Sequence, residues 1–90
     1  DTALGPTVNA AIGSNRPRVA VAAALAAGRL GLTDCVDVVC MMLTANADQD
    51  PIIRHAGIMA LAGQPDLNRV AALSAHPSEF VRVAAVVALR

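Results

Sequence analysis

Residues 50–63 read DPIIRHAGIMALAG, and this stretch decides the fold. Asp50 can accept a hydrogen bond from a free amide at a helix start, and Pro51 loses nothing in a first helical turn, where its missing N–H would be unpaired. Gly63 stands where a left-handed residue commonly closes a helix. Alanine, the strongest helix former, recurs between these signals. The stretch therefore predicts one helix that begins near residue 50.

The core of this stretch, Arg-x-Ala-x-x-x-Ala-Leu, occurs three times, starting at Arg18, Arg54 and Arg82. These arginines stand 36 (54 − 18) and 28 (82 − 54) residues apart, close to the period of helix-pair repeats. Similar start and stop signals flank the outer copies, so we expect arginine-led helices that begin near residues 15, 50 and 77. The flanking signals are Ser14 or Asn15 before Pro17, Gly28 or Gly31 after the first copy, and His76 or Ser78 around Pro77.

Three partner segments, about 2–12, 33–45 and 65–75, lie between the copies, and apolar residues at i, i+3, i+4 and i+7 in the second and third predict helices. Thr33 with Asp34 is the expected cap of the second. Turns of roughly two to five residues place successive helices antiparallel. We therefore expect an all-α chain of three helix pairs, with repeats at about 1–31, 32–63 and 64–90. Residues 1–90 form one domain, and the lack of an initiator Met suits a piece of a longer chain.

Composition argues against several functions. The seven arginines balance seven acidic residues and form no run, which disfavours a nucleic-acid partner. Phe80 is the one aromatic residue, so no stacking platform is available for bases. The longest apolar run is too short to span a bilayer, so we expect no membrane partner. The compartment is not decided by the sequence, and a cytoplasmic one is the expectation.

Catalytic and metal-binding patterns are weak. Cys35 and Cys40 lie about 140° apart around a helix, so they cannot pair within it, and we interpret them as small buried apolar side chains. His55 and His76 have no Cys or His at metal-ligand spacing, and no signature joins them to a nucleophile. His76, which precedes Pro77, is expected to cap a turn. We predict no enzymatic activity, no cofactor and no metal.

At the level of motifs the chain resembles HEAT repeats, specifically the phycobilisome-lyase-like HEAT class, whose second helices carry Asp-x-x-Val-Arg-x-x-Ala-x-x-Ala-Leu-Gly. The stretch 50–63 matches nearly throughout and 77–89 matches well, while the first copy departs from the pattern because Pro17 replaces the apolar residue before Arg18. The resemblance covers about residues 14–90. It implies a right-handed α-solenoid, the α-α superhelix, and says little about function.

In arrays of this kind the arginine-led helices line a concave surface, and the resemblance implies that the first, second and fifth residues after each arginine point outward to a partner. Carried over, the implied contacts are Val19, Ala20, Ala23, His55, Ala56, Met59, Val83, Ala84 and Val87. The recurring arginines are expected to be structural, each bonding a neighbouring aspartate such as Asp50 or free helix-end carbonyls.

These residues form an almost entirely apolar surface, which favours a protein–protein interaction scaffold whose partner is another protein or a neighbouring domain of the same chain. On this interpretation, aspartate at Ala56 or Ala84 abolishes binding and leaves helicity intact. Two alternatives stay open. One is a structural array that forms homo-oligomers through its last helix, which has no polar outer face. The other, carried by the resemblance alone, is an accessory domain of a larger enzyme such as a bilin lyase.

Overall fold

A computed structural model describes residues 4–90, and within that range the chain forms six α-helices and two short 3₁₀ turns, with no strand. The prediction of an all-helical chain is confirmed. Residues 2 and 3 of the first expected helix lie outside the described residues. The elements are α1 (Leu4–Ile12), α2 (Pro17–Leu30), η1 (Thr33–Cys35), α3 (Val36–Asn46), α4 (Pro51–Ala62), α5 (Leu67–Ala72), η2 (Leu73–Ala75) and α6 (Glu79–Ala88).

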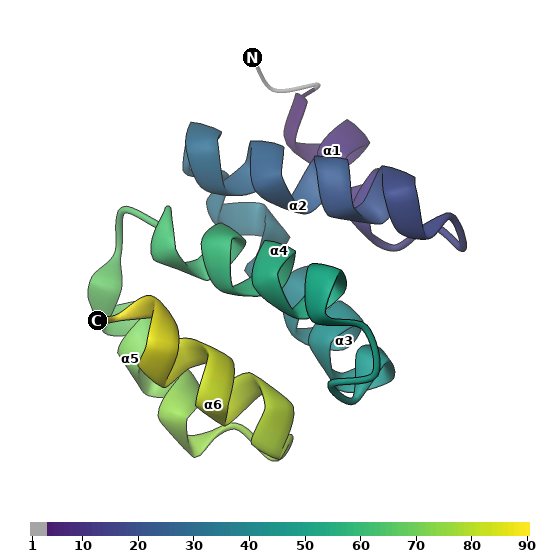
Figure 1. Cartoon of the computed structure of the whole chain (residues 1–90). Helices are drawn as coiled ribbons and strands as arrows, with labels where there is room; N and C mark the ends of the chain where they lie inside the picture. Colours follow the sequence, from purple (N-terminus) through teal and green to yellow (C-terminus); the bar gives the residue numbers. More distant parts are fainter. Residues whose placement is uncertain (1–3) are drawn as a thin grey trace.

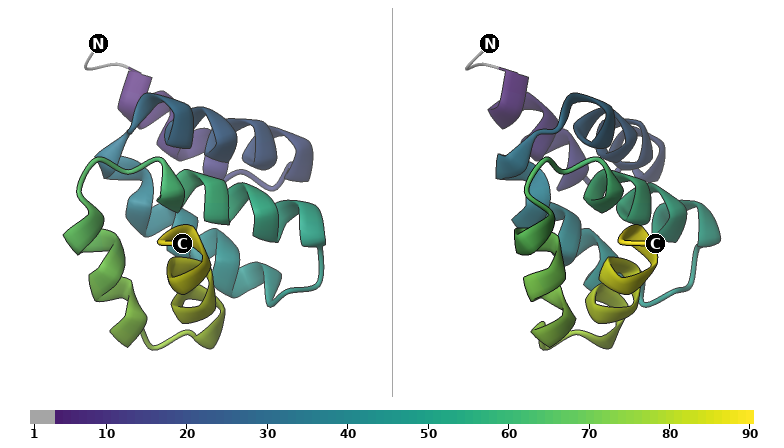
Figure 2. Two further views of the ribbon diagram at one scale, coloured as in Figure 1. Left: turned by 60° about the vertical axis from the view of Figure 1, so that its left-hand side comes forward. Right: turned by 90° about the vertical axis from the view of Figure 1, so that its left-hand side faces the viewer.

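The three arginine-led helices, α2, α4 and α6, lie side by side, with α4 in the middle in contact with both others (Figure 1). Each packs antiparallel against the helix that precedes it, so that α1, α3 and α5 lie on the far side of α2, α4 and α6. The α2–α4 contact is the most extensive in the molecule. Figure 2 shows that α2 and α4 run nearly parallel, whereas α6 is steeply inclined to α4.

Helix starts follow the expected signals only in part. Asp50 caps α4 as predicted, since its Oδ1 accepts the Ile52 amide at 2.9 Å. The predicted cap at Thr33 with Asp34 is wrong, because neither side chain bonds a helix amide there and η1 begins without a side-chain cap. The helix α2 also lacks a side-chain cap, and relies on proline at its first turn.

Helix ends likewise follow the expected signals at some positions and not at others. Gly31 closes α2 in the left-handed conformation, with φ of 63°, as predicted for that position. Gly63 also ends its helix, but at φ of −84°, so the prediction of a left-handed closure there is wrong. Ala47 takes the left-handed role after α3 at φ of 49°, a position where a residue with a Cβ is uncommon.

Gly28 and Gly63 allow a close contact between helices, because the backbones of α2 and α4 touch at this point. A Cβ atom added to Gly63 would overlap the carbonyl group of Gly28, and one added to Gly28 would lie 2.5 Å from the Met59 carbonyl oxygen. The side of α2 near its C-terminus can therefore approach the end of α4 only if both positions are glycine. This close approach fixes the spacing of the two central helices.

The buried apolar side chains form one continuous cluster to which every helix contributes. Its largest fully buried members include Ile12, Leu43 and Leu61, and small alanines fill the contacts between the arginine-led helices. Gly57 inside α4 faces the side chain of Leu43 on α3, where an added Cβ would lie 2.5 Å from a leucine methyl carbon. The helices α3 and α4 therefore pack closely at Gly57.

Candidate partner-binding surface

The three arginine-led helices carry several exposed apolar side chains. Along α4 the exposed residues recur at intervals of three and four, which places them in one stripe. Met59 and Val83 are 44% and 49% exposed, large fractions for such side chains. We define the exposed apolar face as Val19 and Ala22 on α2, Ile52, His55, Met59 and Ala62 on α4, and Val83 and Val86 on α6.

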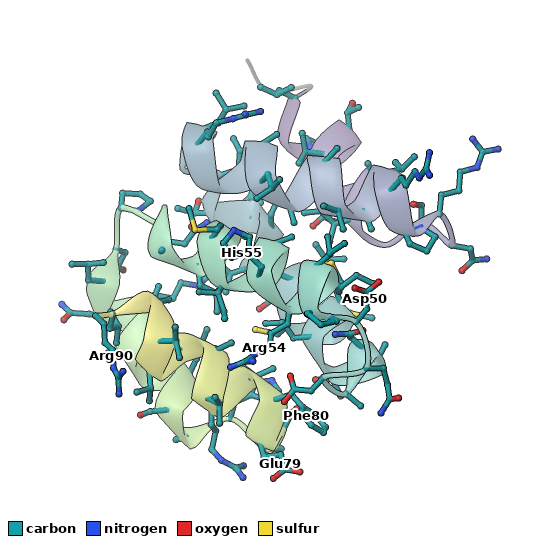
Figure 3. The ribbon with its side chains drawn as sticks, in the orientation of Figure 1. Asp50, Arg54, His55, Glu79, Phe80 and Arg90 are labelled. Atoms are coloured by element: carbon teal, nitrogen blue, oxygen red, sulfur yellow. The ribbon has the colours of Figure 1, made fainter. Side chains whose placement is uncertain are left out.

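Five of the nine residues that the resemblance implied for binding are accessible. Val19, His55, Met59 and Val83 are exposed, and Val87 is partly exposed. Figure 3 shows His55 on the outward side of α4, facing the viewer. For these five positions the implied orientation agrees with the structure. Whether they contact a partner stays a prediction.

The other four implied contacts are core residues, and their assignment to the surface is wrong. These are Ala20, Ala23, Ala56 and Ala84. Ala56 is completely buried, and Ala84 is 2% exposed. The second position after each arginine turns inward, where a methyl group lets neighbouring helices approach closely. An aspartate at Ala56 or Ala84 would place a charge in the core, so the expected selective loss of binding is replaced by loss of folding.

Sequence reasoning missed four members of the exposed apolar face: Ala22, Ile52, Ala62 and Val86. A signal for them was present. In α4, Ile52, His55, Met59 and Ala62 recur at intervals of three, four and three, which is a regular helical stripe, and the buried Ala56 and Ala60 lie beside this stripe. The family pattern implies contacts only at the first, second and fifth residues after each arginine, and these four residues stand at other positions.

A hollow interrupts the exposed apolar face where α2 and α4 come closest. Its floor is Gly28 and Gly63, which have no side chains, and its walls come from Leu25, Met59 and Ala62. Arg29 stands at its edge. The hollow follows directly from the glycine contact between the helices, because any side chain at Gly28 or Gly63 would fill it or push α2 away.

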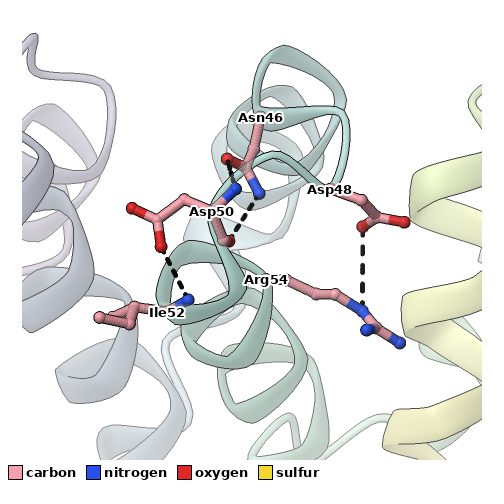
Figure 4. Close-up of polar contacts among 5 residues, drawn as sticks. All are labelled: Asn46, Asp48, Asp50, Ile52 and Arg54. Carbon is pink, nitrogen blue, oxygen red and sulfur yellow. Dashed lines mark hydrogen bonds and ion pairs between the residues drawn. The ribbon is translucent and has the colours of Figure 1, made fainter.

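The repeated arginines are structural in two of three cases, although none bonds Asp50. Arg54 extends toward α6 and its Nε lies 3.8 Å from Oδ1 of Asp48, in the loop before α4 (Figure 4). Asp50 is occupied with the helix cap, and its backbone is held by Asn46, whose side chain bonds both the N–H and the C=O of Asp50. Arg54 therefore pairs with a neighbouring aspartate as expected, although this is Asp48 and not Asp50, and the Asn46 contact was not predicted.

Arg82 follows the prediction more closely. Its Nη1 donates to the carbonyl oxygens of His76 and Pro77, at 2.8 and 3.0 Å, and so closes the turn that leads into α6. His76 acts in the same turn, where its Nδ1 accepts the Ser78 amide, which agrees with the predicted capping role. Arg18 differs, because it is exposed and has no hydrogen bond or ion pair within residues 4–90.

The sequence also did not predict two sets of polar contacts between segments that lie far apart in the chain, made by Arg69 and Gln64. Arg69 on α5 donates to the Thr33 carbonyl oxygen at 2.9 Å and lies 3.7 Å from Asp37, which links the third helix pair to the second. Gln64 is buried, and its amide donates to the carbonyl oxygens of Leu32 and Ala60. Neither residue belongs to the recurring motif, so the repeat pattern gave no sign of them.

A shallow pocket between α3 and η2 brings Asp37, Cys40 and His76 onto one lining. The Cys40 thiol is protonated there, because burial and the nearby Asp37 raise its pKa to about 11. Burial likewise raises the pKa of the Cys35 thiol. Both cysteines are buried and unpaired, as predicted. A neutral thiol is a poorer nucleophile and metal ligand than a thiolate, so the surroundings of Cys40 in this pocket do not activate its thiol.

No family model, curated protein or solved structure matches this chain. The resemblance to HEAT repeats therefore rests on the motif residues alone. Within residues 4–90, no group of three or more His, Cys, Asp or Glu side chains could hold a metal ion. In the same range no helix is both long and apolar enough to cross a membrane.

Proposed function

We propose that this chain is a HEAT-like, right-handed α-solenoid module that binds a partner protein on the exposed apolar face. The observation that carries the proposal is the exposure of large Val, Ile and Met side chains on three neighbouring helices. Apolar patches that extend over several elements are uncommon on monomers and mark interaction sites. Complete burial of such a side chain stabilises a complex by about 1.5–3 kcal/mol, and roughly half of that remains available for side chains already half-buried.

The proposal can be tested with two methionines that differ mainly in their position. Met59 lies in the last turn of α4 on the exposed apolar face and is 44% exposed, and Met41 lies in the middle of α3 in the other layer and is 69% exposed. Met59→Asp and Met41→Asp therefore carry the same chemical change at exposed helical positions in different layers. Circular dichroism establishes that both variants fold before binding is compared.

We expect the wild-type chain and Met41→Asp to capture the same set of proteins from an extract of the source cells. Met59→Asp is expected to lose that set, because the new carboxylate would have to be desolvated against apolar partner groups. The captured proteins are identified by mass spectrometry. Equal capture by both variants would show that binding takes place elsewhere, and loss by Met41→Asp alone would place it on the other layer.

A second candidate, self-association through the last helix, is favoured by one observation. Leu89, directly after α6, is 42% exposed, and Val86, which also belongs to the exposed apolar face, is 50% exposed. Terminal repeats of helical arrays ordinarily carry a polar outer face. Light scattering over a concentration series tests this candidate: a mass that rises with concentration and falls back in Leu89→Asp supports it, and a constant monomer mass contradicts it.

The proposal of an accessory domain in a larger enzyme such as a bilin lyase has no such observation in its favour. Addition of a bilin pigment to the chain, followed by absorption spectroscopy, tests it. A shift of the pigment spectrum would support this role.

A further inference from the structure

The charged residues are divided unevenly between the two sides of the molecule. The helices α2 and α4 carry Arg18, Arg29 and Arg54 and contain no acidic residue at all. In the other layer α1 is uncharged, and the segment 33–46 carries Asp34 and Asp37 and no basic residue. Near these helices Asp48 pairs with Arg54, Asp50 caps α4 and α6 carries both Glu79 and Arg82, so the excess of positive charge lies on α2.

The two arginines of α2 are free to bind a partner. Arg54 and Arg82 are engaged within the molecule, whereas Arg18 and Arg29 are exposed and make no hydrogen bond or ion pair in the described part of the chain. Eleven residues separate them, which corresponds to about 16 Å along a helix and a rotation of about 20°. Both guanidinium groups therefore project from the same side of α2, at its two ends.

The surface between the two arginines is apolar and contains the hollow. Ala22 and Leu25 stand four and seven residues after Arg18, in one stripe with Arg29, and Leu25 and Arg29 border the hollow floored by Gly28 and Gly63. The hollow offers space for one large apolar side chain beside a cation. A partner that fits this surface needs apolar groups in the middle and negative charge at both ends.

We infer that the occupant of the exposed apolar face is an acidic peptide segment, with carboxylates that pair with Arg18 and Arg29 and a large apolar side chain that enters the hollow. The inference rests on the proposed function and specifies its partner class. Arginine suits this role because its planar guanidinium can bind a carboxylate through two parallel hydrogen bonds. Two carboxylates about 16 Å apart correspond to positions ten to eleven residues apart on a partner helix, or about five on an extended segment.

An anionic lipid surface and a nucleic acid share the negative charge but fit less well. Membrane-surface helices use Trp or Phe beside their basic residues, and single-stranded nucleic acids stack on aromatic side chains. Phe80 is the chain's single aromatic residue and is only partly exposed. Both surfaces serve as comparison arms in the experiment.

A display library of random 16-residue peptides, panned on the full chain, tests the inference. We expect the enriched peptides to carry net negative charge and at least one Leu, Ile, Met or Phe. A synthetic copy of an enriched peptide should bind roughly tenfold more weakly to the double variant Arg18→Glu/Arg29→Glu, because reversal of both exposed charges turns attraction into repulsion. The control is Arg16→Glu, which reverses an exposed arginine that lies before α2 and outside the exposed apolar face.

The outcomes separate this inference from the proposed function. Enriched peptides that are neutral or basic, yet lose binding to Met59→Asp, would overturn the acidic partner and leave the binding face intact. Enriched peptides that bind Met59→Asp unchanged would overturn both. Phosphatidylserine vesicles that sediment the chain, or a single-stranded oligonucleotide that binds it, while the library yields no acidic peptide, would also overturn the inference.

Discussion

Replacement of Gly63 by alanine probes the closest contact in the molecule. The new Cβ would overlap the carbonyl group of Gly28, which is backbone and cannot rotate out of the way. The backbone at Gly63, with φ of −84° and ψ near 0°, is itself open to alanine, so the effect comes from the α2–α4 contact and not from local strain. The helices α2 and α4 would have to move apart, and with them the hollow beside Arg29.

The magnitude follows from two opposing terms. Alanine restricts the unfolded chain and would by itself stabilise the fold by about 0.4–1 kcal/mol. Insertion of a methyl group into a close contact typically costs about 1–3 kcal/mol, and the backbone overlap places Gly63→Ala at the upper end. The net expectation is a loss of about 2–2.6 kcal/mol, or roughly 8–20 °C in Tm for a domain of this size.

Thermal unfolding followed by circular dichroism measures this loss, and Gly13→Ala is the matched control. Gly13 is exposed after α1, and an added Cβ would make an ordinary contact 3.4 Å from a methyl carbon of Val38. We expect Gly13→Ala to be neutral or slightly stabilising. If Gly63→Ala melts at the same temperature as Gly13→Ala, the close approach of α2 and α4 is not as described.

Three further predictions address the core, a helix cap and a buried thiol. Ala56→Asp should fail to give a cooperative melt, since an unpaired charge would enter the core, whereas Met59→Asp at the exposed face should melt within about 1 kcal/mol of wild type. Asp66→Ala should cost about 1 kcal/mol in urea unfolding, because Asp66 accepts the amides of Asn68 and Arg69 at the start of α5; an unchanged midpoint would refute this capping role. The pKa of Cys40 is raised from 9.0 to about 11 in the folded state, so the unfolded state loses its proton first and stability should fall between pH 9 and 11. Cys40→Ala should flatten that pH dependence, and an equal slope in both proteins would contradict it.

Helix positions were predictable because their causes are local. Pro17 and Pro51 fix first turns, Asp50 supplies a side-chain cap, and alanine-rich runs continue each helix. The weakest expected helix, over residues 2–12, forms from Leu4 because Pro6 falls within its first turn, where no hydrogen bond is lost. The pattern of three arginine-led copies likewise predicted which helices lie side by side.

The orientation of each helix about its axis was less predictable, because it is set by tertiary contacts. The motif gave Ala20, Ala56 and Ala84 equal positions but not their direction, and all three face inward. The sequence indicated that Gly63 closes a helix in the left-handed conformation. Glycine is required there because the backbone of Gly28, 35 residues earlier (63 − 28), leaves no space for a Cβ atom.

The candidate site was therefore half predicted. Val19, His55, Met59 and Val83 were placed on the surface correctly, while the hollow and its border at Arg29 depend on the α2–α4 contact and have no counterpart in the repeat pattern. The separation of charge between the two layers could likewise not be predicted from the repeat pattern. Its residues are visible in the sequence, but only the packing of α2 beside α4 places the positive charge of α2 next to the apolar residues of α4.

Methyl NMR during titration of the chain with a captured partner tests the central claim most directly, since the chain is rich in Val, Leu, Ile and Met. We predict that the methyl signals of Val19, Met59 and Val83 shift together and saturate at one concentration, while that of Met41 does not move. A shift confined to Met41 and Leu67, with the three helices of the exposed apolar face unaffected, would contradict the account.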